Sequence, residues 1–432
     1  MLDIQFIRDN PEMVAQKAGE KGYQVDITQL LGFDTERREL LTEVENLRRA
    51  RNELTAQSKG GKPTDEILEK GRQLRDQLAD LEHRLEAIEK QYHELMSTVP
   101  NIPLEDVPVG ASEDENQVVK KVGEPTSFDF EPKSHSVIAE AKDWIDKERA
   151  AKVAGSRFAY LKGDLALLQF AIINFTIQKL GDQSLIEQLI KDNNLILLPK
   201  AFTPVLPPAL IRTEPYEASA RLNAQEDTYQ LAHDDLWLNA SAEHSLCTMY
   251  WNEILPADQL PIRYIGYSTS FRREAGSYGK DTEGIFRMHQ FDKLEMEVFS
   301  TPDTGLDEHK LLIAIQEYLV QQLGLPYTLI QKCTADIGKP NASGYDIDTW
   351  MPAQSNYRET HTADYMTDYQ ARDLKTRTRL TDGSIVLVHT NDATAFALGR
   401  ILIAIIENNQ TAEGNVIVPE VLVPFMGGKT QI

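Results

Sequence analysis

The chain has few cysteines, no long apolar run and fewer basic than acidic residues. Its two cysteines, Cys247 and Cys333, lie far apart among 432 residues. They cannot build a disulfide framework or a four-thiolate zinc site, so we expect a protein of the reducing cytoplasm without zinc. No run approaches the roughly 20 apolar residues that span a bilayer. Residues 1–5 lack the basic and apolar regions of a signal peptide.

The deficit of basic residues gives a formal net charge of −22. Indiscriminate nucleic-acid binding depends on the neutralisation of phosphates, so this charge argues against it. A local basic surface for one particular RNA is still compatible with it. The length allows two or three domains, and 41% hydrophobic with 26% charged residues is ordinary for a soluble protein.

The N-terminal quarter predicts a helical hairpin. Asn10-Pro11 is typical of a helix start, and a longer helical pattern begins after Asp34-Thr35. Glycines and a proline interrupt this pattern at residues 58–64. A second run then has an apolar residue every three or four positions, as in a coiled-coil seam: Leu74, Leu78, Leu81, Leu85, Ile88, Tyr92 and Leu95. We expect an antiparallel two-helix arm over about residues 36–98, within an N-terminal domain of residues 1–105.

Basic residues gather on the first arm helix and at the tip of the arm, namely Arg37, Arg38, Arg48, Arg49, Arg51, Lys59 and Lys62. They form either an ordinary solvated face with ion pairs or a surface that contacts RNA phosphates. The acidic, proline-punctuated residues 106–127 predict a linker, which leaves residues 128–432 as a second domain.

One stretch of the second domain, residues 269–295, has the composition of a nucleotide pocket. It contains Arg272 and Glu274, a loop with glycines and a return strand. Strand alternation predicts one shared face for Arg287, His289, Phe291, Lys293 and Glu295. Such a face is a poor core but suits a nucleotide, because arginine binds phosphate and an aromatic ring stacks on a base. The alternative is an exposed β-hairpin with cross-strand ion pairs.

Residues 269–295 also resemble motif 2 of the class II aminoacyl-tRNA synthetases, and within that class the seryl-tRNA synthetases. The resemblance covers nearly the whole chain in order. Residues 200–208 are similar to motif 1, whose proline marks a dimer interface, residues 239–244 to the serine-binding loop, and residues 389–400 to motif 3. It implies an α+β fold, in which an antiparallel-sheet class II catalytic domain follows an N-terminal antiparallel coiled-coil arm.

The resemblance also implies an ATP site. Arg272 would hold the α-phosphate and Arg400 the γ-phosphate, as the two catalytic residues, while Phe291 would stack on adenine. The full implied set is Arg272, Arg273, Glu274, Met288, Phe291, Glu359, Thr360, His361, Thr362 and Arg400. Glu359 would carry Mg²⁺ between the phosphates. We expect His361 to make a plain hydrogen bond, because this chemistry needs no histidine base.

The implied serine-binding residues are Ser241, Ala242, Glu243, Glu295 and Thr394. The two glutamates would bind the ammonium and hydroxyl groups of L-serine. The residues alone leave other readings open: Ser-Ala-Glu is also a common helix start, and Arg400 could form a salt bridge in the core.

The implied activity is that of a serine—tRNA ligase, which makes seryl-adenylate from serine and ATP and transfers the serine to tRNA(Ser). The resemblance implies a homodimer whose arm grips the tRNA, with Arg37, Arg48, Arg49 and Arg51 as contacts, and leaves open whether tRNA(Sec) is also charged. Glu283 and Asp392 depart from the family, which usually has arginine and an amide there. Two alternatives therefore stand. One is an amino-acid-activating paralogue with an altered substrate, including a ligase that loads a carrier protein, and the other is a non-catalytic RNA-binding paralogue.

Overall fold

The computed structural model describes residues 1–57, 64–222, 227–274 and 284–432. Lys59, Lys62 and Glu283 lie outside these residues. The chain divides into two units, Met1–Ile102 and Pro103–Ile432. Within the described ranges, none of the helices is both long enough and apolar enough to cross a membrane.

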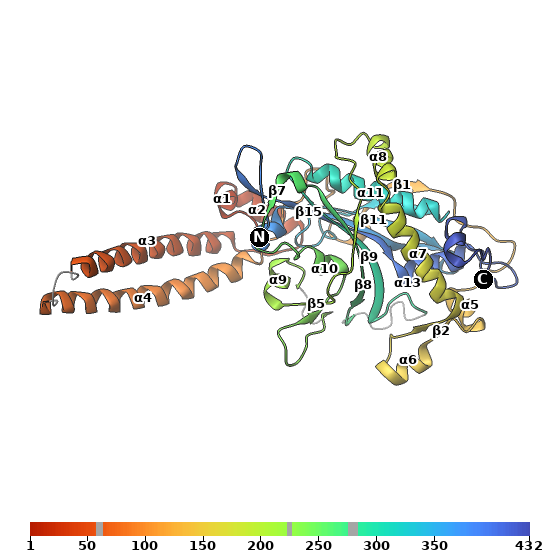
Figure 1. The fold of residues 1–432 in the computed structure, drawn as a ribbon, viewed down its shortest axis with the longest axis horizontal. Helices are drawn as coiled ribbons and strands as arrows, with labels where there is room; N and C mark the ends of the chain where they lie inside the picture. Colours follow the sequence, from red (N-terminus) through yellow and green to blue (C-terminus); the bar gives the residue numbers. More distant parts are fainter. Residues whose placement is uncertain (58–63, 223–226, 275–283) are drawn as a thin grey trace. The chain divides into compact units, whose positions relative to one another are not determined.

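The first unit consists of two short helices and a long helical hairpin (Figure 1). Helices α1 (Ile4–Asp9) and α2 (Pro11–Glu20) lead into α3 (Ile27–Gln57) and α4 (Asp65–Met96). Cross-helix ion pairs join Arg37 to Glu89 and Arg48 to Glu82, which requires α3 and α4 to run antiparallel. Every seam residue expected on α4 is buried or half-buried, and the positions between them are mostly exposed. The predicted arm is therefore confirmed.

The first arm helix begins earlier than the sequence indicates, at Ile27 and not after Asp34-Thr35. Asp34 looks like a helix cap, but Arg8 of α1 binds both of its carboxylate oxygens, at 2.7 and 2.8 Å. Asp34 is 1% exposed. Local sequence patterns do not reveal this role of Asp34, because Arg8 lies 26 residues away in sequence.

The second unit is built on one eight-stranded sheet with the order β1-β10-β11-β12-β15-β9-β8-β4. Neighbouring strands are antiparallel, except that β4 runs parallel to β8. The strands are β1 (Gln117–Val122), β4 (Thr203–Val205), β8 (Ile262–Phe271), β9 (Gln290–Ser300), β10 (Tyr327–Gln331), β11 (Ser343–Met351), β12 (Asn356–Thr367) and β15 (His389–Ala397). This sheet confirms the expected α+β fold.

Smaller elements surround the sheet. The short strands are β2 (Ile145–Asp146), β3 (Tyr160–Leu161), β5 (Leu210–Ile211), β6 (Trp237–Leu238), β7 (Ile254–Pro256), β13 (Arg377–Arg379) and β14 (Ile385–Leu387). The helices are α5 (His135–Ala141), α6 (Lys147–Ala154), α7 (Gly163–Leu180), α8 (Gln183–Asp192), α9 (Thr213–Ala218), α10 (Ala242–Leu246), α11 (Gly305–Gln322), α12 (Tyr369–Leu374) and α13 (Leu398–Asn408). The 3-10 turns are η2 (Glu113–Glu115), η4 (Ala257–Gln259), η5 (Pro352–Gln354) and η6 (Glu420–Met426).

Strand β1 lies inside residues 106–127, whose composition indicates a linker. It pairs antiparallel with β10 at the edge of the sheet. Val118 and Val119 remain more than half exposed. An edge strand with both faces in solvent needs no alternation of apolar and polar residues, so local patterning could not reveal this one.

One face of the sheet is apolar and packs on helices. Leu294, Met296 and Val298 of β9 join a core that includes residues of α7, α11 and α13. In α13, every residue from 401 to 406 is fully buried, as its apolar sequence predicts. The alternate residues of β9 must then point to the other face.

That other face carries charge. It presents Lys293, Glu295 and Glu297 of β9, and α10 covers part of it. Gly266 of β8 lies opposite Glu295. A Cβ on Gly266 would stand 2.7 Å from Cδ1 of Leu246 in α10, so glycine permits this close approach. The sheet thus separates an apolar core from a half-covered polar face.

A fully buried ion pair fastens α11 to β8. The Nε and Nη2 atoms of Arg263 donate to the two carboxylate oxygens of Glu308, each at 2.8 Å. Both side chains are 0% exposed. Nη1 of Arg263 donates to the carbonyls of Leu198 and Lys200 at 3.1 and 2.6 Å, so the guanidinium is well satisfied.

Replacing this arginine, as in Arg263→Met, should lower the free energy of unfolding by about 3–5 kcal/mol, because Glu308 would stay buried without a counter-charge. Denaturant unfolding would measure the loss. Adding Glu308→Gln should restore part of it. A loss below about 1 kcal/mol in the single variant would contradict this view of the pair.

Candidate active site

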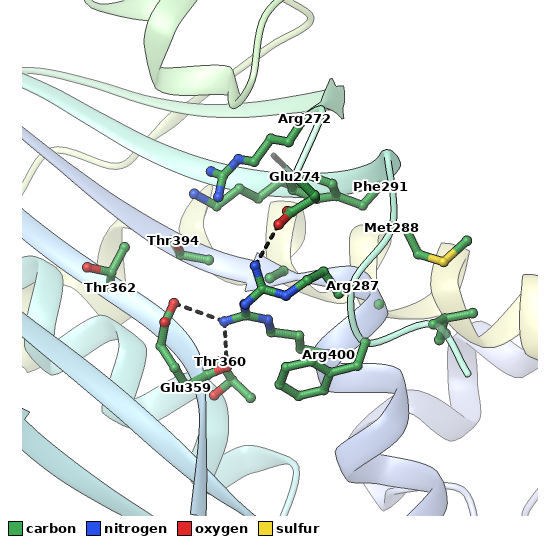
Figure 2. A pocket seen from close by; sticks show the side chains of 15 residues that line it. Arg272, Glu274, Arg287, Met288, Phe291, Glu359, Thr360, Thr362, Thr394 and Arg400 are labelled. Carbon is green, nitrogen blue, oxygen red and sulfur yellow. Dashed lines mark hydrogen bonds and ion pairs between the residues drawn. The ribbon is translucent and has the colours of Figure 1, made fainter. Parts of the chain in front are cut away.

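The polar face of the sheet opens into a cleft with an empty volume of about 700 Å³ (Figure 2). Most of the expected ATP-binding residues line it: Arg272, Glu274, Met288, Phe291, Glu359, Thr360, Thr362 and Arg400. Thr394, expected at the serine, lines it as well. Side chains from β9, β12, β15 and α13 therefore meet at one place although they are far apart in the sequence.

Two expected ATP-binding residues do not line the cleft. The guanidinium of Arg273 lies 5.7 Å from the centre of the Tyr229 ring. His361 is buried, and its Nδ1 lies 2.8 Å from Oγ1 of Thr360. Burial lowers the pKa of His361 to about 3. A histidine with so low a pKa holds a proton weakly and is a poor general base, which suits a hydrogen-bonding role.

The strands are shorter here than alternation alone suggests. Strand β8 ends at Phe271, so Arg272 and Glu274 lie beyond it, and Glu274 has a φ of 53°. Strand β9 begins only at Gln290. The shared face holds for Phe291, Lys293 and Glu295 but not for His289, whose Nδ1 lies 2.9 Å from the carbonyl oxygen of Arg272. Arg272 and Glu274 reach the cleft from the turn that follows β8. The alternation of side chains along a strand does not describe the geometry of such a turn.

One end of the cleft is rich in arginine and aromatic rings. The guanidinium of Arg272 lies 5.3 Å from the centre of the Phe291 ring, and those of Arg358 and Arg400 lie 4.3 and 4.9 Å from that of Phe286. Figure 2 shows Arg400 turned toward Glu359, to which it donates at 3.0 Å. Planar cations and stacking surfaces in one cleft suit an anionic nucleotide.

Arg287 and Glu274 meet across this end of the cleft. Nη1 of Arg287 donates to the Glu274 carboxylate at 2.6 Å (Figure 2). The pair fixes the carboxylate against the turn, beside Phe291. A carboxylate held there can accept hydrogen bonds from an exocyclic amino group of a stacked base.

The other end of the cleft centres on Lys293. Its Nζ lies 2.6 Å from Oε2 of Glu295 and 3.8 Å from Oε2 of Glu243, and it donates to Oγ of Ser241 at 2.9 Å. Oγ1 of Thr394 lies 3.5 Å from Oε1 of Glu295. All five side chains are buried.

These contacts bear on whether Ser241-Ala242-Glu243 is only a helix start or also part of a polar site. Ser241 does stand at the N-cap position of α10, with Ala242 fully buried behind it, but its side chain makes no capping hydrogen bond. Its hydroxyl accepts from Lys293 instead. The serine therefore belongs to the polar cluster and not only to the helix start.

The cluster holds more negative than positive charge. Burial raises the pKa of Glu295 well above its ordinary range despite Lys293, with Glu243 and Asp392 adding to the rise. One ammonium serves two buried carboxylates. A ligand that brings a further ammonium would improve the balance of charge.

Comparison with known proteins agrees with this geometry. Residues 1–103 match the model of the seryl-tRNA synthetase N-terminal domain, and residues 227–409 match that of the tRNA synthetase class II core domain (G, H, P, S and T). The chain is 37% identical to a serine--tRNA ligase of Thermodesulfovibrio yellowstonii, over 99% of both chains. It is 38% identical to one of Symbiobacterium thermophilum, over 98% of both. The chain belongs to the seryl-tRNA synthetase family.

Solved structures of family members are also similar. Seryl-tRNA synthetase from Pyrococcus horikoshii, complexed with ATP, has a TM-score of 0.86 and 36% identity, covering 100% of this chain and 99% of that one. Cytoplasmic serine-tRNA ligase from Naegleria fowleri, in complex with AMP, has a TM-score of 0.82 and 27% identity, covering 100% of this chain and 98% of that one. The predicted family and fold class are thus confirmed.

The structure adds residues to which the family resemblance gave no role. Arg287 and Lys293 lie on the polar face that strand alternation predicts, so the sequence could have placed them at the site. No sequence pattern indicates such a position for Phe286 or Arg221. Arg221 binds the carboxylate of Asp392, the residue that departs from the family amide. Asp392 is therefore engaged by the protein itself.

Replacing the shared cation, as in Lys293→Met, should lower the free energy of unfolding by about 3 kcal/mol at pH 8, because Glu243 and Glu295 lose their buried counter-charge. The pKa of Glu295 is raised in the folded protein. The contribution of such a group to folding stability is complete below its unfolded pKa and is lost as pH rises through its folded pKa. The deficit should therefore shrink as pH falls toward 5.

Denaturant unfolding across this pH range measures the effect, and Lys293→Met/Glu295→Gln should recover part of the stability at pH 8. A deficit that is the same at pH 5 and pH 8 would show that Lys293 acts by packing and not by charge.

Proposed function

We propose that the protein is a serine—tRNA ligase, which activates L-serine with ATP and transfers it to the 3′ end of tRNA(Ser). The observation that carries the proposal is the joining of two half-sites on one face of the sheet. An arginine-lined aromatic end continues into the Lys293–Glu295 cluster, with Thr394 and Lys293 lining the same cleft. Membership of the seryl-tRNA synthetase family supports it.

The nucleotide would lie at the arginine end. Adenine stacks on Phe291, and its amino group donates to Glu274, which Arg287 holds in place. The Met288 backbone reads the edge of the base. Arg272 and Arg400 hold the α- and γ-phosphates, with Thr360 and Thr362 on the floor of the cleft. Catalysis on this view is positioning and stabilisation of charge, and no covalent enzyme intermediate forms.

Serine would lie at the other end. Its ammonium and hydroxyl bind Glu243 and Glu295, beside Ser241 and Thr394. The serine carboxylate attacks the α-phosphorus, the bond to the β-phosphate oxygen breaks, and pyrophosphate leaves. The ribose hydroxyl of the tRNA then attacks the carbonyl of the adenylate and releases AMP. Glu295 provides specificity, because a buried polar group loses its partner when an analogue lacks the hydroxyl.

ATP requires a divalent cation in this class of enzyme, and we propose Mg²⁺ held by Glu359. Asp348 lies opposite Glu359 in the β11–β12 register. Burial and the neighbouring Glu359 raise the pKa of Asp348 to about 6. Two neighbouring carboxylates beside the expected phosphates form an oxygen donor set that fits a hard cation. Bound there, the ion would neutralise phosphate charge.

The arm would bind the long variable arm of the tRNA. Arg49 and Arg51 are exposed and form no ion pair with any other residue that the structure describes. Arg37 and Arg48 pair with glutamates of α4, so phosphates would have to compete for them.

We also propose a homodimer in the cytoplasm. Large apolar side chains around β4 are exposed, with Leu206 at 81% and Ile196 at 86%, and they support the homodimer. Both cysteines are buried and unbridged, which supports the cytoplasm.

The first test is serine-dependent exchange between ATP and pyrophosphate. The wild type should catalyse it with Mg²⁺, and Arg400→Ala should slow it about 100-fold or more, because one charge-stabilising donor is lost. Arg379→Ala, exposed on β13, serves as the control. A folded protein without exchange would refute the proposal and favour a non-catalytic paralogue.

The arm is tested by reversing charge in Arg49→Glu/Arg51→Glu. Charging of tRNA(Ser) should fall about tenfold or more in kcat/KM and depend less on salt, because phosphate contacts are lost. Serine exchange should be unchanged. Arg49→Lys/Arg51→Lys keeps the charge and should charge tRNA almost normally. Unaltered charging in the glutamate variant would remove these two residues from the tRNA contact.

A further inference from the structure

A row of three carboxylates crosses the sheet next to the proposed serine end. Glu297 of β9 lies directly opposite Asp392 of β15, and Asp392 lies opposite Asp364 of β12. Side chains opposite each other on neighbouring strands point to the same face and lie close together. Glu295 and Thr394 are themselves opposite each other, two residues along from Glu297 and Asp392. The row therefore continues the polar face beyond the pocket.

Two members of this row have a cation and one does not. Arg221 binds Asp392, and Nζ of Lys332 lies 2.9 Å from Oδ1 of Asp364. Glu297 is 0% exposed, and neither of its carboxylate oxygens has a hydrogen-bond partner among the residues that the structure describes. An isolated buried carboxylate is costly, and a fold that needed only to pack would gain from an apolar residue there.

The electrostatic balance near Glu297 is negative. Burial raises the pKa of Glu297 well above its ordinary value, and Asp392 adds to this despite Arg221. Burial also raises the pKa of Asp392 to about 7. The resemblance to seryl-tRNA synthetases places an amide where this chain has Asp392, so the polar face beside this pocket is more acidic than the family pattern. A cation bound nearby would lower both pKa values.

We propose that the pocket accepts, besides serine, a short amino acid whose side chain ends in an ammonium in place of the serine hydroxyl. L-2,3-diaminopropionate has this shape, with nitrogen where serine has oxygen, so it needs no additional space. An ammonium donates three hydrogen bonds and accepts none, which suits a site where Glu297 has no donor among the described residues and carboxylates outnumber cations. Glu295 would contact the ammonium, and Glu297 and Asp392 would stabilise its charge.

The inference rests on the proposed function, since the chemistry is the same. The α-carboxylate attacks the α-phosphorus of ATP, the aminoacyl-adenylate forms, and pyrophosphate leaves with the electron pair of the broken bond. The side-chain ammonium takes no part in the step. It contributes through binding alone, and so it should affect kcat/KM through the electrostatic fit of the pocket.

The test is pyrophosphate exchange by the full chain with Mg²⁺ and one amino acid at a time. L-Serine and L-2,3-diaminopropionate should both support exchange. L-Alanine, which lacks a side-chain donor, and L-2,4-diaminobutyrate, which is one methylene longer, should be much poorer. Glu297→Gln and Asp392→Asn should each lower kcat/KM for diaminopropionate about tenfold or more relative to serine. Both substitutions keep the size of the side chain.

The outcomes separate the two claims. Exchange with serine but none with diaminopropionate overturns this inference and leaves the proposed function standing. No exchange with either overturns the proposed function. Exchange with both, at a ratio that Glu297→Gln and Asp392→Asn leave unaltered, overturns the role of the carboxylate row. The comparison of substrates in the wild type decides the first point even if a variant fails to fold.

Discussion

The alternation of side chains along β9 is the constraint on which the second unit depends. Leu294, Met296 and Val298 point into the core, while Lys293, Glu295 and Glu297 point to the polar face. A slip of one residue in the register with β8 or β15 would bury the charges among the helices and expose the apolar side chains. The Arg263–Glu308 pair, which ties β8 to α11, helps to hold this register in place.

The charged side chains of the polar face lower the stability of the sheet. Carboxylates directly opposite each other on neighbouring strands destabilise a sheet, and this sheet carries Glu297, Asp392 and Asp364 in one row. Arg221 and Lys332 each offset one of them, and Lys293 is shared between Glu243 and Glu295. Such an arrangement makes sense where a ligand supplies the remaining positive charge.

The sequence was most informative where function depends on local pattern. The α4 seam and the apolar α13 could be predicted because helical periodicity is a local property. The residues on the return strand could be placed because alternation needs only neighbours in sequence. The Arg8–Asp34 and Arg221–Asp392 pairs could not be predicted, because they join residues 26 and 171 positions apart. The ends of β8 and β9 could not be predicted, because the alternation of side chains does not continue through a turn. Strand β1 could not be predicted either, because an exposed edge strand needs no alternation of apolar and polar residues.

The anchoring of Arg272 links the two ends of the cleft. Its Nε donates to the carbonyl of Ala240 at 3.1 Å, next to Ser241, and the preceding Phe271 N–H donates to Asn239 at 3.0 Å. The arginine proposed to bind the nucleotide is thus tied to the loop proposed to bind the amino acid. A ligand that settles one of them also orders the other, and such coupling is reciprocal by thermodynamic necessity. The two substrates should therefore bind with positive cooperativity, each raising the affinity of the site for the other.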